Sequence, residues 1–319
     1  MADFKSLTLR ECADAIVAVE KPLVIMHVRP DGDTVGSAAA LCEIFKALGK
    51  SPKYICEDEI PQRLAFLVEG LCRAESTDGF DAVSIDVASP SQMGKLFDEV
   101  TVRLAIDHHA VNTPFAPNYT VAAASSAGEV LLGVAKELAA RGLIEITEKI
   151  AYPIYTAISS DTGGFAFSNA TAETHRAAAD LIALGIDHAD INRRLFMSKS
   201  REQIRAEGFV ASKMETGAEG KISYAAISQS DVSTLGLASS DFDTAIDVVR
   251  SLMGAEISFI VKETDRGFKA SMRSTGANVA EIAARHGGGG HVRAAGCNID
   301  ADSVHDAAKI LLSELEALF

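Results

Sequence analysis

Three adjacent side chains that can bind a metal ion follow an apolar segment of the sequence. Asp107, His108 and His109 come directly after the run Val102–Ile106, which has the length and composition of a buried strand. Successive side chains of an extended chain point to opposite sides. One histidine could therefore ligate a metal while the other faces a substrate, and Asp107 could orient an imidazole. We interpret the triplet as part of a metal site in preference to a polar loop.

A second group of such residues lies near the start of the chain. His27, Asp31 and Asp33 flank Pro30 and Gly32, two residues that force a turn. The turn lets one imidazole and two carboxylates point into a small volume, and this set suits a hard or borderline divalent cation. The alternative is a loop whose aspartates cap the next helix. Taken alone, this segment leaves both interpretations open.

Two further aspartates end predicted elements and could add carboxylates. Asp86 ends the predicted strand Ala82–Asp86, where a lone Asp is usually a helix cap. Asp161 follows an apolar helix and precedes Gly163 and Gly164, which let the backbone turn tightly and approach a ligand. A plain helix end would explain Asp161 equally well. Only the other segments favour a bridging metal ligand at Asp86 and a second carboxylate ligand at Asp161.

A glycine-rich stretch in the last third of the chain predicts phosphate binding. Gly287–Gly290 precede His291, and the N–H groups of consecutive glycines can form a nest for an anion. Arg273, which ends the predicted strand Phe268–Arg273, could pair with a phosphate or stack on a base. The alternatives are a flexible loop and a surface arginine. We favour phosphate binding because a histidine and an Ala-Ala-Gly sequence follow the glycines at once.

These segments need a scaffold that brings strand ends together. Strands alternate with helices through the first half of the chain, which argues for a parallel sheet with helices on both faces. Open sheets of this kind bind ligands at the strand ends. The predicted strands are Leu23–Val28, Pro52–Cys56, Ala82–Asp86, Val102–Ile106 and Tyr119–Ala122. The predicted helices are Leu7–Val19, Thr34–Leu48, Gln62–Val68, Ser89–Asp98, Ala127–Arg141, Thr147–Ser160, Ala172–Leu184 and Ala189–Phe196.

A change of pattern predicts a second, smaller α/β domain. Lys199–Met214 is polar and basic, as expected for an exposed linker helix. The strands predicted after it are Ile222–Ile227, Glu256–Glu263 and Phe268–Arg273, and the helices are Asp241–Met253, Val279–His286 and Ser303–Leu318. We therefore expect a catalytic domain at residues 1–192, a linker helix at residues 193–214 and a substrate-binding domain at residues 215–319.

Composition limits the partners. The formal net charge of −14 argues against wrapping long nucleic acid, because phosphate neutralisation needs a basic surface. There is no tryptophan, which excludes a Trp-based binding platform. The five scattered cysteines include no Cys-x-x-Cys pair, so we expect reduced thiols in a cytoplasmic protein. We expect no signal peptide and no membrane contact, since no apolar run approaches ~20 residues.

In their order along the chain, these motifs resemble the DHH/DHHA1 phosphoesterase family. The N-terminal domain of that family carries a His-x-x-x-Asp-x-Asp motif, a strand-end Asp, an Asp-His-His motif and a later Asp, and its DHHA1 domain carries Gly-Gly-Gly-His. The resemblance spans nearly the whole chain. The length is similar to that of the stand-alone oligoribonuclease/pAp phosphatase type, whereas RecJ-like exonucleases carry added nucleic-acid-binding domains.

The resemblance implies two divalent metal ions, typically Mn²⁺. It implies that His27, Asp31 and Asp86 hold one ion, and that Asp33, Asp86, His108 and Asp161 hold the other. It places Asp86, Asp107, His108 and His109 in the catalytic set, with His109 touching the scissile phosphate or supporting the site. The far phosphate or nucleotide of the substrate would contact Arg273, Gly288, Gly289, Gly290 and His291.

We therefore expect a hydrolase in which two metals activate a water for in-line attack on a phosphoester. The expected substrates are short oligoribonucleotides and 3′-phosphoadenosine 5′-phosphate (pAp), held across a cleft between the domains. Alternatives that keep the site are linear dinucleotides such as pApA, pyrophosphate and polyphosphate. A non-catalytic RNA-binding module is a further alternative, against which the full set of ligands argues. A homodimer would also fit the resemblance.

Overall fold

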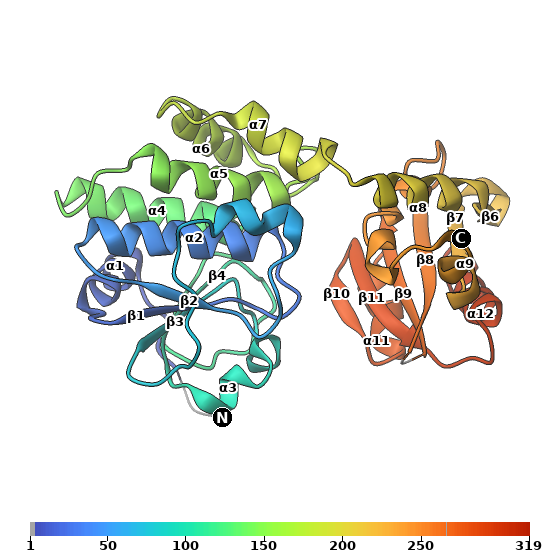
Figure 1. Cartoon of the computed structure of the whole chain (residues 1–319), viewed down its shortest axis with the longest axis horizontal. Helices are drawn as coiled ribbons and strands as arrows, with labels where there is room; N and C mark the ends of the chain where they lie inside the picture. Colours follow the sequence, from blue (N-terminus) through green and yellow to red (C-terminus); the bar gives the residue numbers. More distant parts are fainter. Residues whose placement is uncertain (1–3, 266) are drawn as a thin grey trace. The chain divides into compact units, whose positions relative to one another are not determined.

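The computed structural model describes residues 4–265 and 267–319, apart from the side chain of His291. The chain forms two compact units that divide between Ser198 and Lys199 (Figure 1). Helix α8 (Arg201–Ser212) falls within the segment predicted as a linker. Its residues Ala206 and Val210 are buried in one hydrophobic cluster with the core of the second unit.

The first unit is built on a parallel sheet, as predicted. Its strands are β1 (Pro22–Ile25), β2 (Lys53–Ile55), β3 (Asp81–Ile85), β4 (Val102–Asp107) and β5 (Asn118–Thr120). They lie in the order β2-β1-β3-β4-β5, and every pairing is parallel. Central strands of such a sheet are buried on both faces, which is why they form continuous apolar runs in the sequence. The carboxyl ends of β1, β3 and β4 share one edge.

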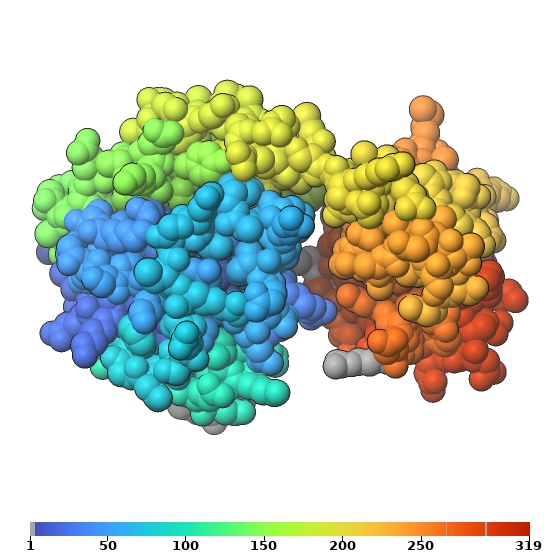
Figure 2. All heavy atoms as spheres, in the orientation of Figure 1, coloured from blue at the N-terminus to red at the C-terminus, as the bar shows by residue number. Residues whose placement is uncertain are grey.

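Helices cover one face of this sheet in successive layers. The helices are α1 (Leu9–Ala18), α2 (Gly32–Ala47), α4 (Ala127–Ala140), α5 (Glu148–Asp161), α6 (Ala172–Ile182) and α7 (His188–Asn192). Helix α2 packs against both the sheet and α5, while α6 and α7 form the outer layer over α5, yellow-green in Figure 2. Two glycines permit this close packing. A Cβ at Gly36 would lie 2.7 Å from the carbonyl oxygen of Pro153, and one at Gly128 would lie 2.5 Å from the Cβ of Ala157.

The other face of the sheet has a thinner cover. It consists of the 3₁₀ turn η2 (Pro90–Met93), the short helix α3 (Leu96–Glu99) and adjoining loops, and Met93 and Leu96 pack in one cluster with β1. The prediction of a single helix over Ser89–Asp98 is wrong. Gly94 adopts a φ of +60° between the two turns, and this left-handed conformation ends the first of them.

The second unit contains a mixed sheet in the order β10-β11-β9-β8-β7-β6, in which only β7 and β8 pair in parallel. Its strands are β6 (Glu215–Gly217), β7 (Ile222–Ile227), β8 (Ile257–Thr264), β9 (Gly267–Ser274), β10 (Gly289–His291) and β11 (Ala294–Ile299). Its helices after α8 are α9 (Gln229–Leu235), α10 (Ile246–Arg250), α11 (Val279–Arg285) and α12 (Val304–Glu316). Helices α11 and α12 pack in one hydrophobic cluster with the sheet, and α8 and α10 pack in another.

One predicted helix of the second unit is wrong, and one pair of strands was not predicted. The expected helix Asp241–Met253 is divided into the 3₁₀ turn η5 (Ser239–Phe242) and α10, because the carboxylate of Asp241 accepts a hydrogen bond from the N–H of Ala238 (2.8 Å) and closes the first turn separately. Two of the four consecutive glycines, Gly289 and Gly290, lie in β10, which pairs with β11 as an antiparallel hairpin that was not predicted. Throughout the described ranges, no helix has the length and apolar content that crossing a membrane requires.

Candidate metal centre

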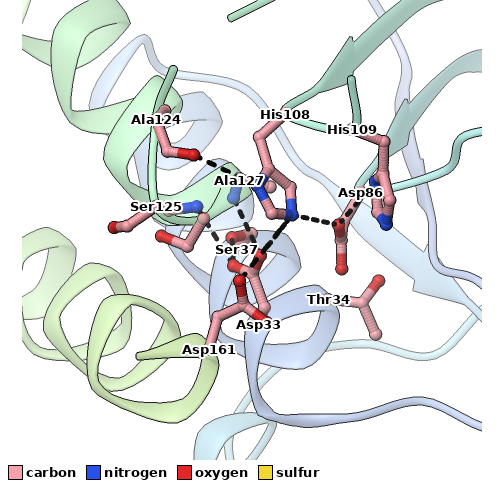
Figure 3. A network of polar contacts seen from close by, with 12 residues as sticks. Asp33, Thr34, Ser37, Asp86, His108, His109, Ala124, Ser125, Ala127 and Asp161 are labelled. Atoms are coloured by element: carbon pink, nitrogen blue, oxygen red, sulfur yellow. Dashed lines mark hydrogen bonds and ion pairs between the residues drawn. The ribbon is translucent and has the colours of Figure 1, made fainter. Parts of the chain in front are cut away.

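Five segments of the first unit meet at the carboxyl ends of its parallel strands. Figure 3 shows Asp33, Asp86, His108 and Asp161, which come from four of these segments. His27 follows β1, Asp86 follows β3, and His108 follows β4. Asp31 and Asp33 lie at the start of α2, and Asp161 is the last residue of α5. The six predicted metal ligands are thus gathered from positions up to 134 residues apart, and they form groups that could each hold an ion.

The first group consists of His27, Asp31 and Asp86. The Nε2 atom of His27 lies 3.7 Å from Asp31 Oδ1 and 3.4 Å from Asp86 Oδ2. Asp31 is also the N-cap of α2, since its carboxylate accepts hydrogen bonds from the N–H groups of Asp33 and Thr34. Burial disfavours the charged imidazole, but the carboxylates of Asp31 and Asp86 outweigh it and raise the pKa of His27 to about 11. Asp31 therefore caps helix α2 and also belongs to the first group of candidate ligands.

The second group surrounds His108. Its Nε2 atom lies 3.6 Å from Asp33 Oδ2, 3.5 Å from Asp86 Oδ1 and 3.9 Å from Asp161 Oδ2. Its other ring nitrogen, Nδ1, is 3.4 Å from the carbonyl oxygen of Ala124, which orients the ring so that Nε2 faces the carboxylates. Burial and the charges of Asp33 and Asp31 raise the pKa of Asp161 to about 8.

Asp86 stands between the two groups. Its Oδ2 atom faces His27 and its Oδ1 atom faces His108. Only 2% of the residue is exposed, and Oδ1 has no hydrogen-bond donor among the described residues. Burial and the charge of Asp33 hold the pKa of Asp86 well above its usual range. A buried carboxylate oxygen without a donor, among three other aspartates, is an environment that divalent cations neutralise.

The backbone at Asp86 is unusual. Its φ is +60°, in the left-handed region that favours glycine and tolerates Asp and Asn. The N–H of Asp86 donates to the carbonyl oxygen of Ile106 on β4, so the chain turns only after this contact. The turn aims one carboxylate at both histidines, and local strain of this kind is common at functional sites.

His109 is paired with Asp107. Its Nδ1 atom lies 2.7 Å from Asp107 Oδ1 and 3.7 Å from Asp86 Oδ1. Burial disfavours the charged imidazole, but the carboxylate of Asp107 prevails and raises the pKa of His109. The contact with Asp107 matches the orienting role that the sequence suggested for this residue. The two histidines of the motif therefore differ in their surroundings, since His108 faces three carboxylates and His109 is hydrogen-bonded to Asp107 and lies near Asp86.

A helix end holds Asp33, and this contact was not predicted. Asp33 Oδ2 accepts the N–H of Ala127 (2.8 Å), and Oδ1 accepts the N–H of Gly128 (3.1 Å) and the hydroxyl of Ser37 (3.0 Å). The two N–H groups belong to the first turn of α4, which carries partial positive charge. The cap of this helix, Ser126, starts a Ser-x-x-Glu sequence, and this capping signature was the available signal.

A second unpredicted contact holds Asp161. The Nδ2 atom of Asn169 donates to the carbonyl oxygens of Asp161 (3.1 Å) and Ser125 (3.0 Å), and it lies 3.4 Å from Asp161 Oδ2. The carboxylate of Glu129 accepts from the hydroxyls of Ser125 (2.5 Å) and Thr174 (2.9 Å). No sequence motif marks Asn169, because its partners are mainly backbone carbonyls.

The second unit places its predicted residues on the sheet. Arg273 lies on β9 between Ser258 of β8 and Ala294 of β11. Its guanidinium donates to the carbonyl oxygen of Met272 (2.9 Å), and it forms no ion pair within the described chain. Burial lowers the pKa of Arg273. A half-buried guanidinium without an ion pair in the described chain is suited to an anionic ligand.

The glycines of the β10 segment, two strands away from Arg273, differ from one another in their surroundings. A Cβ at Gly288 would lie 2.2 Å from the carbonyl oxygen of Gly296, and one at Gly290 would lie 2.5 Å from that of Ala294. A Cβ at Gly289 would meet no atom within 4 Å. The hairpin itself therefore accounts for two of the three glycines. The side chain of His291, also predicted to bind substrate, lies outside the described part of the structure.

Comparisons with known proteins agree with this architecture. The model of the DHH family, N-terminal domain, matches residues 21–158, and that of the DHHA1 domain matches residues 220–317. The bifunctional oligoribonuclease and PAP phosphatase NrnA of Thermus thermophilus is 32% identical over 297 residues, which cover 91% of this chain and 88% of that protein. A probable manganese-dependent inorganic pyrophosphatase of Listeria welshimeri is 26% identical over 60% of this chain and 62% of its own length.

A solved structure shares the fold. An exopolyphosphatase-related protein from Bacteroides fragilis matches with a TM-score of 0.88 at 21% identity, covering 97% of this chain and 96% of that one. The two domain models and the Thermus relative establish the lineage. The chain belongs to the DHH/DHHA1 phosphoesterase family and is a hydrolase that acts on phosphoester bonds.

Proposed function

We propose that this hydrolase releases mononucleotides from short oligoribonucleotides and AMP from pAp, and that it works with two divalent metal ions, Mn²⁺ foremost. The observation that carries the proposal is the position of Asp86, whose two oxygens face two separate groups of His and Asp ligands. The activities named for the Thermus relative support the choice of substrates. A formal net charge of −14 favours short substrates over long nucleic acid.

The residues fit two ions. His27 and Asp31, with Asp86 Oδ2, would hold one, and Asp33, His108 and Asp161, with Asp86 Oδ1, would hold the other. When bound, the two ions supply the Lewis-acid charge that polarises a phosphoryl group and acidifies water. Oxygen and imidazole ligands suit Mn²⁺, and the Listeria relative is named as manganese-dependent.

The side chains around these ligands fix their positions. The first turn of α4 holds Asp33, and Asn169 holds Asp161, so neither carboxylate needs to reorganise during the reaction. His109, oriented by Asp107, lies beside Asp86 and would donate a hydrogen bond to a phosphoryl oxygen. Arg273 and Gly288–Gly290 would bind the part of the substrate that does not react.

A substrate panel tests this proposal. The purified full chain would be given a labelled diribonucleotide, a longer RNA, pAp, pApA and pyrophosphate, each with Mn²⁺, with Mg²⁺ and with chelator. We expect the fastest hydrolysis for the short RNA and pAp, with mononucleotide or AMP as product, and none with chelator. Pyrophosphate or pApA as the best substrate would replace the proposed substrates by that one. Calorimetric titration with Mn²⁺ should give two ions per chain; one ion or none would overturn the two-metal mechanism.

A further inference from the structure

The 3₁₀ turn η2, on the face of the sheet with the thinner cover, contacts two of the turns that carry candidate metal ligands. Both contacts come from Gln92. Its backbone carbonyl oxygen accepts the N–H of Val28 (2.6 Å), the residue after His27. Its side-chain Oε1 accepts the N–H of Ala88 (2.6 Å), two residues after Asp86. One residue therefore links the turn after β1 to the turn after β3, and these two turns carry the imidazole and the shared carboxylate of the first ligand group.

The turn after β1 is held by hydrogen bonds from outside the turn. The carbonyl oxygen of His27 accepts the thiol of Cys56 (3.2 Å), and the carboxylate of Asp58 accepts the N–H of Arg29 (2.7 Å). Arg29 has a φ of +56°, a left-handed conformation that a bulky residue keeps only where its surroundings impose it. The position of His27 therefore depends on the segments on either side, which are the end of β2 and η2.

The turn after β3 is held in the same way. Ala88 is buried, and its carbonyl oxygen accepts the N–H of Thr113 (2.7 Å) while its N–H donates to Gln92. Both backbone polar groups of Ala88 are therefore satisfied. Without the side-chain oxygen of Gln92, the N–H of Ala88 would lose its acceptor, and a buried donor without an acceptor destabilises the backbone conformation that exposes it. Asp86, two residues earlier in the same turn, would shift with it.

The second ligand group has supports of its own. The first turn of α4 holds Asp33, and Asn169 holds Asp161. The N–H of Asp86 donates to the carbonyl oxygen of Ile106 on β4, the strand that leads to the histidine of this group. Removing the side-chain oxygen of Gln92 leaves all of these contacts in place.

We propose that Gln92 is a positioning residue for the first metal ion, because its amide oxygen keeps the turns of His27 and Asp86 at the separation that this ion requires. This inference rests on the proposed binding of two ions. Partners that hold metal ligands from outside the coordination shell typically account for a factor of about 10–100 in metal affinity. The thinner cover of the sheet thus has a role in metal binding besides the burial of apolar residues.

Calorimetric titration of the full chain with Mn²⁺ tests this proposal without turnover. Gln92→Met keeps the length of the side chain but removes the acceptor, and Gln92→Glu keeps an acceptor oxygen. Gln62→Met, at an exposed glutamine of the 3₁₀ turn η1 (Gln62–Leu67), is the matched control. We expect Gln92→Met to weaken the binding of one ion by about 10- to 100-fold and to leave the other unchanged. Gln92→Glu and the control should bind both ions at least as tightly as the wild type.

Three results would overturn the proposal: equal weakening of both ions in Gln92→Met, no weakening, or the same loss in Gln92→Glu. If Gln92→Met does not fold, Gln92→Asn takes its place, because it withdraws the acceptor by one methylene group. If the wild type binds two ions and Gln92→Met binds both as tightly, this inference fails and the two-ion proposal stands. If the wild type binds one ion or none, the two-ion proposal fails as well.

Two variants that each lack one ligand group identify the affected ion. Asp161→Ala removes a ligand of the second group, and His27→Ala removes a ligand of the first. We expect Gln92→Met to weaken the remaining ion of Asp161→Ala by the same factor as in the otherwise wild-type chain, and to have no effect on the remaining ion of His27→Ala. The reverse pattern would show that Gln92 acts on the second group and would refute the proposal.

Discussion

The two units place opposite charges at their candidate binding residues. In the first unit, aspartates crowd around two histidines, and the pKa values of Asp86 and Asp161 are raised because burial and neighbouring carboxylates disfavour their ionised forms. In the second unit, Arg273 is half-buried on a sheet, and burial lowers its pKa. One arrangement calls for cations and the other for an anion.

The two regions also differ in how far their geometry identifies a ligand. Within each ligand group of the first unit, the donor atoms lie close enough together to bind one metal ion. The class of ligand therefore follows from the donor atoms. In the second unit, close packing in the hairpin already accounts for Gly288 and Gly290. A converging set of donors is therefore stronger support for a site than a motif whose residues the fold itself requires.

The largest effect is expected at Asp86. Asp86→Asn keeps a residue that tolerates the left-handed φ but removes the charge that both ligand groups share. We expect kcat/KM for pAp to fall by about 10³-fold or more, as when a preorganised electrostatic group is lost. Steady-state kinetics with saturating Mn²⁺ measure the loss. The exposed Asp98→Asn, on the other side of the sheet, serves as the control, and near-normal activity in Asp86→Asn would contradict the shared-ligand geometry.

A smaller effect on a different parameter is expected at Arg273. Arg273→Ala removes a charged hydrogen-bond donor, which corresponds to roughly 10- to 150-fold in affinity for a phosphate. KM should rise by this factor, while the increase in melting temperature on adding Mn²⁺ should stay unchanged. Arg285→Ala, at an exposed arginine of the same unit, is the matched control. If Arg273→Ala were no longer stabilised by Mn²⁺, metal binding in the first unit and phosphate binding in the second unit would not be separate roles.

Substitutions at the glycines of the hairpin can distinguish two reasons for a glycine: tight packing in the hairpin, and close approach of a substrate to the backbone. Gly288→Ala places a methyl group 2.2 Å from the carbonyl oxygen of Gly296, so we expect a loss of about 1–3 kcal/mol in the free energy of unfolding. Gly289→Ala enters open space and should change stability by less than about 0.5 kcal/mol. Scanning calorimetry measures both. If Gly289→Ala raises KM while leaving stability unchanged, the substrate approaches the backbone there; equal stability of the two variants would refute the packing explanation.

The smallest effect concerns the metal-free protein. The pKa of Asp161 is raised to about 8 in the folded state, against an ordinary value of 3.8. Between about pH 4 and about pH 8 the folded state therefore binds more protons than the unfolded state, and stability falls as the pH rises. Asp161→Asn removes this dependence, so at about pH 8 the chelator-treated variant should melt at a higher temperature than the wild type and gain less from Mn²⁺. A lower melting temperature would contradict the inferred repulsion.

The sequence predicted the parts of the fold that depend on apolar periodicity. The ends of β1, β3 and β4 were predicted to within about three residues, because parallel strands buried on both faces are continuous apolar runs. The hairpin of β10 and β11 was not predicted, since glycine disfavours strands and is typical of loops. Its glycines fit a strand only because Gly296, Ala294 and Ala295 approach so closely, which is a property of the tertiary structure.

The candidate site likewise contains residues that were predicted from the sequence and residues that were not. Residues whose own donor atoms form the candidate site, such as His27 and Asp86, were predicted from type and position. Asn169 and the first turn of α4 were not predicted, because each contact has a backbone group on one side: Asn169 donates to backbone carbonyls, and α4 donates through its backbone N–H groups.

The contact between Asp33 and the first turn of α4 affects how the molecule opens. Amide protons at the beginning of a helix ordinarily exchange fast with solvent, because they have no partner within the helix and the end frays. Here the amides of Ala127 and Gly128 are bonded to a buried carboxylate on α2, and Gly128 packs against α5. The amide protons of this helix end should exchange only when α2, α4 and α5 separate. The carboxylate of Asp33 therefore also stabilises the packing of these three helices.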